Sequence, residues 1–377
     1  MTAFKIDAPQ TAYEVLTVDN VKAALNGLVY SAQPRRFNPL AHLLVVNQAV
    51  HQPLVASGTL VRLFALSQLL TTLISREVRR HRTALEVLSL PQETSRSDAQ
   101  QAIKQDAETA CPELMGWSWL YYHFVRVEFN IGLKDFTRWA AVDERTLRRY
   151  QEHAIWRLTD CLIEQERSTW EMANRRRLYA KLPTSAPVPL LGRESSLKQA
   201  ERFLQHSLPH QVQIVGVSGI GKTAFVQEIT HRLIHGNLID DLLWVDRPSD
   251  VHMLRQQLRE FLECRHDTQM QRILFVFEDI DCLSHDLESL ERLLSDLSAA
   301  VVLLTAQSPL YLRNIGGYIY LNELREDAAC AYIRLLLSNS YREACAAFTE
   351  QDVTTIWAAT SGNPGHIRRS VFEWRCN

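Results

Sequence analysis

The sequence predicts a multidomain protein. An all-α N-terminal domain with a helix-turn-helix comes first, followed by an α/β part with a parallel sheet between helices and a small C-terminal helical lid. Two observations carry this prediction: apolar residues recur at helical spacing before residue 180, and short apolar runs alternate with helical patterns after residue 190. A chain of 377 residues also exceeds one ordinary core, so two or three domains are expected.

Changes of composition divide the chain into five parts. A stretch with three prolines and small residues, at 181–189, is the clearest linker. Pro91 to Asp98 is interpreted as a polar loop between two helical blocks. The expected parts are an N-terminal helical region (1–90), a helical domain (97–180) with a helix-turn-helix (131–160), the linker (181–189), an α/β core (190–322) and a helical lid (323–377).

Composition excludes several classes of protein. A hydrophobic content of 46% with 22% charged residues is typical of a soluble globular protein, and a net charge of −2 gives no global attraction to nucleic acid. The seven cysteines are scattered and never form a C-x-x-C pair, which argues against disulfides and zinc and fits a reducing compartment. The apolar stretch Leu40–Leu73 is interrupted by polar residues, and no signal peptide precedes it. We therefore expect a cytoplasmic protein without membrane contact.

The α/β part begins its alternation after the linker. Its apolar runs lack a polar face, which suits strands buried on both sides in a parallel sheet. The expected strands are 211–216, 242–246, 273–277, 300–305 and 318–321.

Residues Gly216–Thr223 form a complete G-x-x-x-x-G-K-T phosphate loop. The loop follows the strand-like run Gln211–Val215 and precedes the helical run Ala224–Leu233, the context in which this motif binds phosphate. Its N–H groups and the positive end of the helix would hold the β-phosphate, Lys222 would contact the β- and γ-phosphates, and the Thr223 hydroxyl would bind Mg²⁺. The sequence thus predicts a nucleoside triphosphate site. The loop residues assigned to nucleotide binding are Gly216, Ser218, Gly219, Ile220, Gly221, Lys222 and Thr223.

Two carboxylates directly follow the apolar run Ile273–Phe277. A phosphate loop needs acidic groups on a neighbouring strand to hold magnesium and orient water. Glu278 is assigned to the magnesium side and Asp279 to polarising the attacking water, with Asp281 as a less favoured substitute. Together with Lys222 they are the predicted catalytic residues.

These motifs, in this order, resemble the STAND branch of P-loop ATPases, which is close to AAA+ proteins and includes the NB-ARC and NACHT switches. The resemblance covers roughly Leu190 to Asn377 and implies ATP or ADP with Mg²⁺ as cofactors. It implies that Gly192 and Arg193 embrace the adenine side, that Thr305 belongs to the sensor strand, and that Pro364 packs near the base. The motifs that carry it are Leu190–Glu194, Gly216–Thr223, Phe275–Asp279, Leu303–Thr305 and Ser361–Pro364.

Three departures from that family pattern bear on activity. Glu278 stands where aspartate is usual, and Ala306-Gln307 follows Thr305 where a γ-phosphate-sensing arginine is common. We therefore expect ATP hydrolysis that is slow. The chain also stops soon after Pro364, so an effector or sensor is expected on the N-terminal side or on a separate partner protein.

Residues Ile131–Tyr150 predict a helix-turn-helix, with a short helix at 134–141, a turn at Val142-Asp143 and a second helix. The pattern resembles sigma-region-4-type and related bacterial modules. Basic residues at the start of the second helix suit contacts to bases and phosphates of double-stranded DNA. Glu144, Glu152 and the length of the second helix suit a scaffold or partner-binding surface equally well, and the sequence leaves both interpretations open. The DNA-binding candidates are Arg145, Thr146, Arg148 and Arg149.

The leading functional hypothesis is a STAND-type switch whose ATP or ADP state controls the assembly or output of the helix-turn-helix domain. Self-association in the ATP state, and a role in DNA-linked regulation or defence-type signalling, follow from the resemblance. Two alternatives stay open: an AAA+ ATPase of the DNA-remodelling or transposition type that assembles on DNA, and a weakly hydrolysing nucleotide-bound adaptor for a partner protein.

Overall fold

The structure is a computed structural model that describes residues 14–29, 38–49, 58–87, 95–183, 190–206, 211–264, 272–313, 315–338 and 349–376. The chain separates into two compact units, Met1–Ala173 and Asn174–Asn377. The boundary therefore precedes the linker expected at 181–189, of which residues 184–189 lie outside the described ranges.

The described part of the first unit is entirely helical. One hydrophobic core runs from Leu16 to Leu162, so the two helical regions expected at 1–90 and 97–180 share a core. The elements are α2 (Val18–Val29), η1 (Pro39–His42), α3 (Leu44–Ala49), α4 (Thr59–Ala84), α5 (Arg96–Glu108), α6 (Pro112–Leu120), η2 (Tyr121–Val125), η3 (Val127–Phe129), α7 (Leu133–Ala140) and α8 (Glu144–Tyr179), whose last residues belong to the second unit.

The loop expected at Pro91–Asp98 is wrong at its C-terminal end, because α5 already begins at Arg96. The cause is a capping box: the Ser95 hydroxyl accepts the Asp98 N–H at 3.2 Å, and the Asp98 carboxylate accepts the Ser95 N–H at 2.9 Å. Residues 91–94 of the expected loop lie outside the described ranges.

A buried ion pair ties three helices of the first unit together. Arg82 on α4 donates to both carboxylate oxygens of Asp106 on α5, at 2.9 and 2.8 Å, and Asp106 is fully buried. The Ser118 hydroxyl of α6 donates to the same carboxylate at 2.7 Å. Because the buried charge is paired and hydrogen-bonded, removing one partner would be strongly destabilising.

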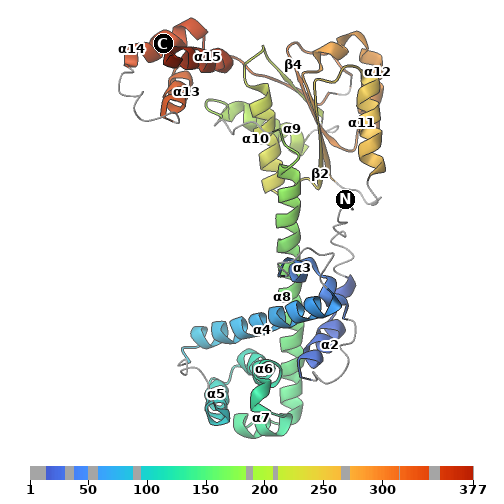
Figure 1. Cartoon of the computed structure of the whole chain (residues 1–377), viewed down its shortest axis with the longest axis vertical. Coiled ribbons are helices and arrows are strands. Elements are labelled where there is room, and N and C mark those ends of the chain that lie inside the picture. Colours follow the sequence, from blue (N-terminus) through green and yellow to red (C-terminus); the bar gives the residue numbers. More distant parts are fainter. Residues whose placement is uncertain are drawn as a thin grey trace. The chain divides into compact units, whose positions relative to one another are not determined.

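The second unit contains the α/β fold that the sequence predicts. Among the residues of this unit that the structure describes, five strands form one parallel sheet in the order β2-β3-β4-β1-β5. Helices α9 and α10 cover one face, and α11 and α12 cover the other (Figure 1). The elements are α9 (Glu194–His206), β1 (Gln211–Val215), α10 (Lys222–His235), β2 (Asp241–Asp246), α11 (Val251–Glu263), β3 (Ile273–Glu278), η4 (Ile280–His285), α12 (Leu287–Asp296), β4 (Val301–Ala306) and β5 (Gly317–Tyr320).

Each predicted strand overlaps an observed one, and most of the predicted strand ends are displaced by a single residue. The sheet confirms the expectation of strands buried on both faces, since every residue of β1 is buried. Parallel pairing brings the carboxyl ends of β1, β3 and β4 to one edge, where ligands bind in open α/β sheets.

The lid consists of α13 (Glu326–Ser338), α14 (Glu350–Thr360) and α15 (Pro364–Cys376) and has a small core of its own. Ala329 and Ile333 of α13 pack with Val353 of α14 and Ile367 of α15 in this core. No helix in the described ranges of either unit is long and apolar enough to span a membrane.

Candidate nucleotide-binding site

A cavity of about 530 Å³ lies in the second unit, within the size range of ligand sites. Five segments far apart in the sequence form it: the start of the α/β core, the phosphate loop with the start of α10, the residues that follow β3 and β4, and the lid. Its lining residues are Leu190, Leu191, Arg193, Ser218, Gly219, Ile220, Gly221, Lys222, Thr223, Ala224, Gln227, Asp279, Gln307, Leu324, Tyr332, Pro364, Gly365 and Arg368.

The phosphate loop has the backbone that its glycines predict. Gly219 and Gly221 have φ values of 77° and 98°, in the left-handed region that favours glycine. A Cβ on Gly216 would lie 2.8 Å from the Ile220 side chain, so this position admits only glycine. A Cβ on Gly221 would meet no atom within 4 Å, which shows open space in front of the loop. The loop therefore fits a phosphate chain.

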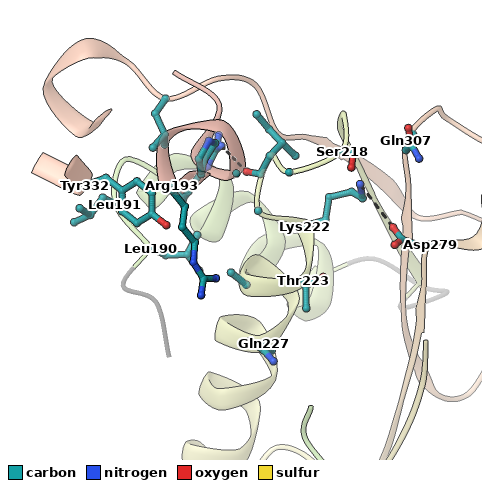
Figure 2. Close-up of a pocket in the computed structure, with 18 residues that line it drawn as sticks. Leu190, Leu191, Arg193, Ser218, Lys222, Thr223, Gln227, Asp279, Gln307 and Tyr332 are labelled. Carbon is teal, nitrogen blue, oxygen red and sulfur yellow. Dashed lines mark hydrogen bonds and ion pairs between the residues drawn. The ribbon is translucent and has the colours of Figure 1, made fainter. Parts of the chain in front are cut away.

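Lys222 points its ammonium group into this loop. Its Nζ donates to the Gly216 carbonyl oxygen at 3.0 Å and lies 3.4 Å from the Val217 carbonyl oxygen. Oδ1 of Asp279 lies 3.7 Å from the same ammonium nitrogen (Figure 2). A buried ammonium that is held mainly by carbonyl groups would bind phosphate oxygens strongly, because hydrogen bonds between charged groups are stronger than those between neutral groups.

Glu278, at the end of β3, is buried beneath the cavity and does not line it. Burial raises the pKa of its carboxyl, and hydrogen bonds from Thr223 and Trp244 partly offset that effect. Trp244 on β2 donates its Nε1–H to Oε2 of Glu278 at 2.9 Å.

The neighbouring Thr223 hydroxyl and Glu278 carboxylate are oxygen ligands of the kind that Mg²⁺ prefers. In the described residues no group of three or more His, Cys, Asp or Glu side chains could hold a metal ion. A magnesium ion at Thr223 and Glu278 would therefore take further ligands from nucleotide phosphates and water, as is usual for this ion.

Asp279 is the carboxylate that faces the cavity. Its φ of 47° is left-handed, and its backbone N–H donates to the Thr305 hydroxyl at 2.8 Å. Thr305 is itself buried and does not line the cavity, so it acts through the Asp279 backbone. Asp281 accepts the Gln307 N–H at 2.8 Å and also the Ser308 N–H, and it is absent from the lining.

Arg193 holds the phosphate loop to the segment before the lid. It is buried, and it donates to the Asn322 carbonyl oxygen at 2.6 Å and to the Ile220 carbonyl oxygen at 3.1 Å. Burial lowers the pKa of its guanidinium group. Gly192 does not line the cavity; its φ is 69°, and a Cβ there would lie 2.6 Å from the Ala328 side chain of α13.

Figure 2 shows Leu190, Leu191 and Tyr332 at the end of the cavity away from Asp279, with Arg193 beside them. Together with Pro364, which also lines the cavity, these side chains offer an apolar surface that suits a flat base. The sequence did not single out Tyr332, Gln227 or Arg368 as site residues. Arg368 follows Pro364 by four residues, one turn along α15, and that spacing is the signal that places it on the same side of the helix.

In the first unit, the DNA-binding candidates lie at the start of α8. Arg145, Arg148 and Arg149 are exposed, and Thr146 is half-buried. The Thr146 N–H and hydroxyl both donate to the Asp143 carboxylate, at 2.9 and 2.6 Å. Arg148 lies 3.9 Å from the Glu144 carboxylate, and the Arg149 guanidinium lies 5.6 Å from the Tyr150 ring centroid. DNA reading by these residues stays a prediction.

No protein-family model matches the chain, and no curated protein matches it. Among solved structures, it is similar to Aeropyrum pernix Orc1 in complex with DNA, with 15% identity and a TM-score of 0.39 over 51% of this chain and 61% of that one. It is similar to the Thermotoga maritima RuvB Holliday junction branch migration motor, with 15% identity and a TM-score of 0.36 over 49% of this chain and 62% of RuvB. The Saccharomyces cerevisiae Hsp104–ADP complex matches with 12% identity and a TM-score of 0.32, over 81% of this chain and 62% of Hsp104.

The chain thus spans 61% to 62% of the length of each of these three proteins. They are AAA+ P-loop ATPases. Because all three TM-scores are below 0.5, the function has to be argued from this chain's own residues.

Proposed function

We propose that the second unit binds ATP and ADP with Mg²⁺ and hydrolyses ATP slowly, as the motor or switch of the chain. The observation that carries this proposal is the cavity in which the phosphate loop, a strand-end carboxylate and an apolar wall meet. The loop offers N–H groups and a buried ammonium for phosphates, and the leucines with Tyr332 offer a surface for the base.

Each residue of the site has a distinct role in the proposed hydrolysis. Lys222 and the loop N–H groups hold the phosphates, and bound Mg²⁺ would neutralise the developing charge on them. Thr223 and Glu278 would hold the ion. Asp279 faces the cavity and would accept a proton from, or orient, the attacking water, while Thr305 fixes the Asp279 backbone. Gln307, in place of an arginine, offers no positive charge to the γ-phosphate, which supports slow turnover.

The cavity wall combines residues of the phosphate loop and of the lid, so a bound nucleotide would contact both and could change how the lid packs on the loop. A ligand shifts an equilibrium only by its differential affinity for the two states, so the γ-phosphate must contact the lid to move it. Arg368 on α15 lines the cavity and is the cation that could make this contact. The STAND-type reading, with assembly in ATP and a compact form in ADP, is proposed on this basis.

Sedimentation velocity of the full chain tests the switch. We expect larger assemblies with a non-hydrolysable ATP analogue than with ADP, and loss of this difference in Arg368→Ala. Equal sedimentation coefficients in both nucleotides, at several protein concentrations, would refute the switch hypothesis. The remaining hypothesis would be a nucleotide-bound adaptor for a partner protein.

A second proposal concerns double-stranded DNA at the start of α8. The supporting observation is that three exposed arginines lie within two helical turns, directly after a tight turn closed by Asp143. The corresponding alternative for this chain is a DNA-remodelling ATPase that assembles on DNA.

Fluorescence anisotropy on labelled duplex, in ATP and in ADP across a salt series, tests this second proposal. Tight binding that weakens steeply with salt would support a DNA reader, because phosphate contacts release counterions. Absence of binding in both nucleotides would make the helical unit a protein-facing surface.

A further inference from the structure

The lid contacts the phosphate loop directly, through one asparagine and two glycines. Asn363 is buried, and its Nδ2 donates a hydrogen bond to the Ser218 carbonyl oxygen at 3.1 Å. The Gly365 backbone N–H donates to the Gly219 carbonyl oxygen at 2.9 Å. Two successive carbonyl groups of the phosphate loop therefore accept hydrogen bonds from the lid.

The two backbones approach closely, so a side chain on Gly365 would force them apart and one on Gly219 would be tightly crowded as well as strained by its positive φ. A Cβ on Gly365 would lie 2.8 Å from the Gly219 Cα atom, and a Cβ on Gly219 would lie 3.0 Å from Oδ1 of Asn363. Real side chains essentially do not tolerate the shorter of these distances. The contact is thus a specific feature of these three positions and does not arise from general packing.

This contact fixes the direction of two loop peptides. In a planar trans peptide, the carbonyl oxygen and the following N–H point in opposite directions. With the Ser218 and Gly219 carbonyl oxygens held by the lid, the N–H groups of Gly219 and Ile220 must point away from it. The Ile220 N–H accordingly donates to the Val217 carbonyl oxygen inside the loop, with 3.3 Å between the nitrogen and oxygen atoms. The Gly219 N–H is turned away from the lid in the same way, and N–H groups turned into the loop are what an anion-binding loop requires.

We propose that Asn363 is a positioning residue that sets the peptide planes of the phosphate loop from the lid. Its Oδ1 accepts the N–H groups of Gly365 at 3.0 Å and His366 at 3.3 Å and so caps α15, while its Nδ2 holds Ser218. One side chain thus joins the start of α15 to the loop. This inference rests on the proposed nucleotide binding, and it makes lid docking and phosphate binding strengthen one another reciprocally.

Asn363→Ser separates the two roles of the side chain. Serine caps helices about as well as asparagine, but it is too short to reach the Ser218 carbonyl oxygen and adds no charge. His366→Ala is the matched control on the same turn, since the His366 side chain is exposed and does not line the cavity. Gly365→Ala is a second, independent variant, because its methyl group would force the two backbones apart.

Two measurements on the full chain decide the matter. Calorimetric titration with Mg-ADP is expected to show Kd about three- to tenfold weaker in Asn363→Ser, the effect of one lost hydrogen bond, and unchanged in His366→Ala. Hydrogen exchange of the phosphate-loop amides, measured without nucleotide, is expected to be faster in Asn363→Ser and Gly365→Ala than in the wild type.

The outcomes distinguish this inference from the proposed function. Wild-type protein that does not bind ADP would refute the nucleotide site, while loop exchange without nucleotide would still report on positioning. Wild-type affinity and wild-type exchange in Asn363→Ser would leave only the capping role and overturn the inference. Tighter ADP binding in that variant would also overturn it, because the lid would then be holding the loop in an unproductive form.

Discussion

Trp244→Phe isolates one hydrogen bond to a residue of the proposed catalytic centre, Glu278. Trp244 is half-buried on β2 and donates its Nε1–H to the buried Glu278 carboxylate at 2.9 Å. Phenylalanine keeps an aromatic ring in the sheet but removes the donor. Trp244 does not line the cavity, so bound nucleotide should not sense the substitution directly.

The size of the effect follows from the charge of the acceptor. A hydrogen bond to an ionised group contributes about 1.5–3 kcal/mol, and partial exposure of the indole places this one near the lower end. Since about 1.4 kcal/mol is a factor of ten, we expect kcat for ATP hydrolysis to fall about tenfold. The KM for ATP should change by less than about threefold, because the lost bond orients Glu278 and does not bind substrate.

Single-turnover hydrolysis of radiolabelled ATP measures the rate constant of the chemical step, which equals kcat when chemistry limits turnover. Trp357→Phe is the control, since Trp357 is a partly buried tryptophan of the lid core and the same atoms are removed there. Unchanged kcat in Trp244→Phe would refute the assignment of Glu278 to the magnesium side. An equal loss in Trp357→Phe would attribute the effect to packing.

Three further predictions follow from the site and the start of α8. Burial raises the pKa of Glu278 above its ordinary value of 4.5, so the charged carboxylate lowers native stability as pH rises from 4.5 through the folded-state pKa. Glu278→Gln should therefore raise the thermal unfolding midpoint of nucleotide-free protein when the pH lies above that window, and leave the midpoint unchanged when the pH lies below it. A midpoint difference that does not depend on pH would contradict this. Arg193→Lys cannot bridge the Ile220 and Asn322 carbonyl oxygens, and calorimetry should show a Tm lower by a few degrees, roughly 1 kcal/mol of stability; an unchanged Tm would show that the bridge is dispensable. Arg148→Ala should reduce the salt slope of any DNA binding by about one phosphate contact in anisotropy titrations, and an unchanged slope would remove Arg148 from the DNA-binding candidates.

The phosphate loop was predictable because its chemistry is local. Glycines at fixed spacing between a strand and a helix define the loop in any fold that presents it, and Gly219 and Gly221 have the positive φ values that this requires. The parallel sheet was predictable for a similar reason, since short β-branched runs without a polar face that alternate with helical patterns are typical of strands covered on both sides.

Residues that depend on strand register or lid docking were not predictable. Trp244 reaches Glu278 because β2 pairs with β3 so that Asp246 lies opposite Glu278, and no local pattern sets that register. Tyr332 and Arg368 enter the cavity only through the packing of the lid. The start of α5 could have been predicted, because Ser95 and Asp98 have the spacing of a capping box. The loop expected from the sequence included both residues instead.

Calorimetric titration of the full chain with Mg-ATP and Mg-ADP tests the nucleotide site most directly. The wild type should bind both nucleotides with one site per chain, and Lys222→Ala should lose most of that affinity because the buried ammonium in the phosphate loop is gone. Lys198→Ala, on the exposed face of α9, should bind like the wild type. Equal affinity of Lys222→Ala and wild type, or no binding by the wild type, would contradict the assignment of this cavity to a nucleotide.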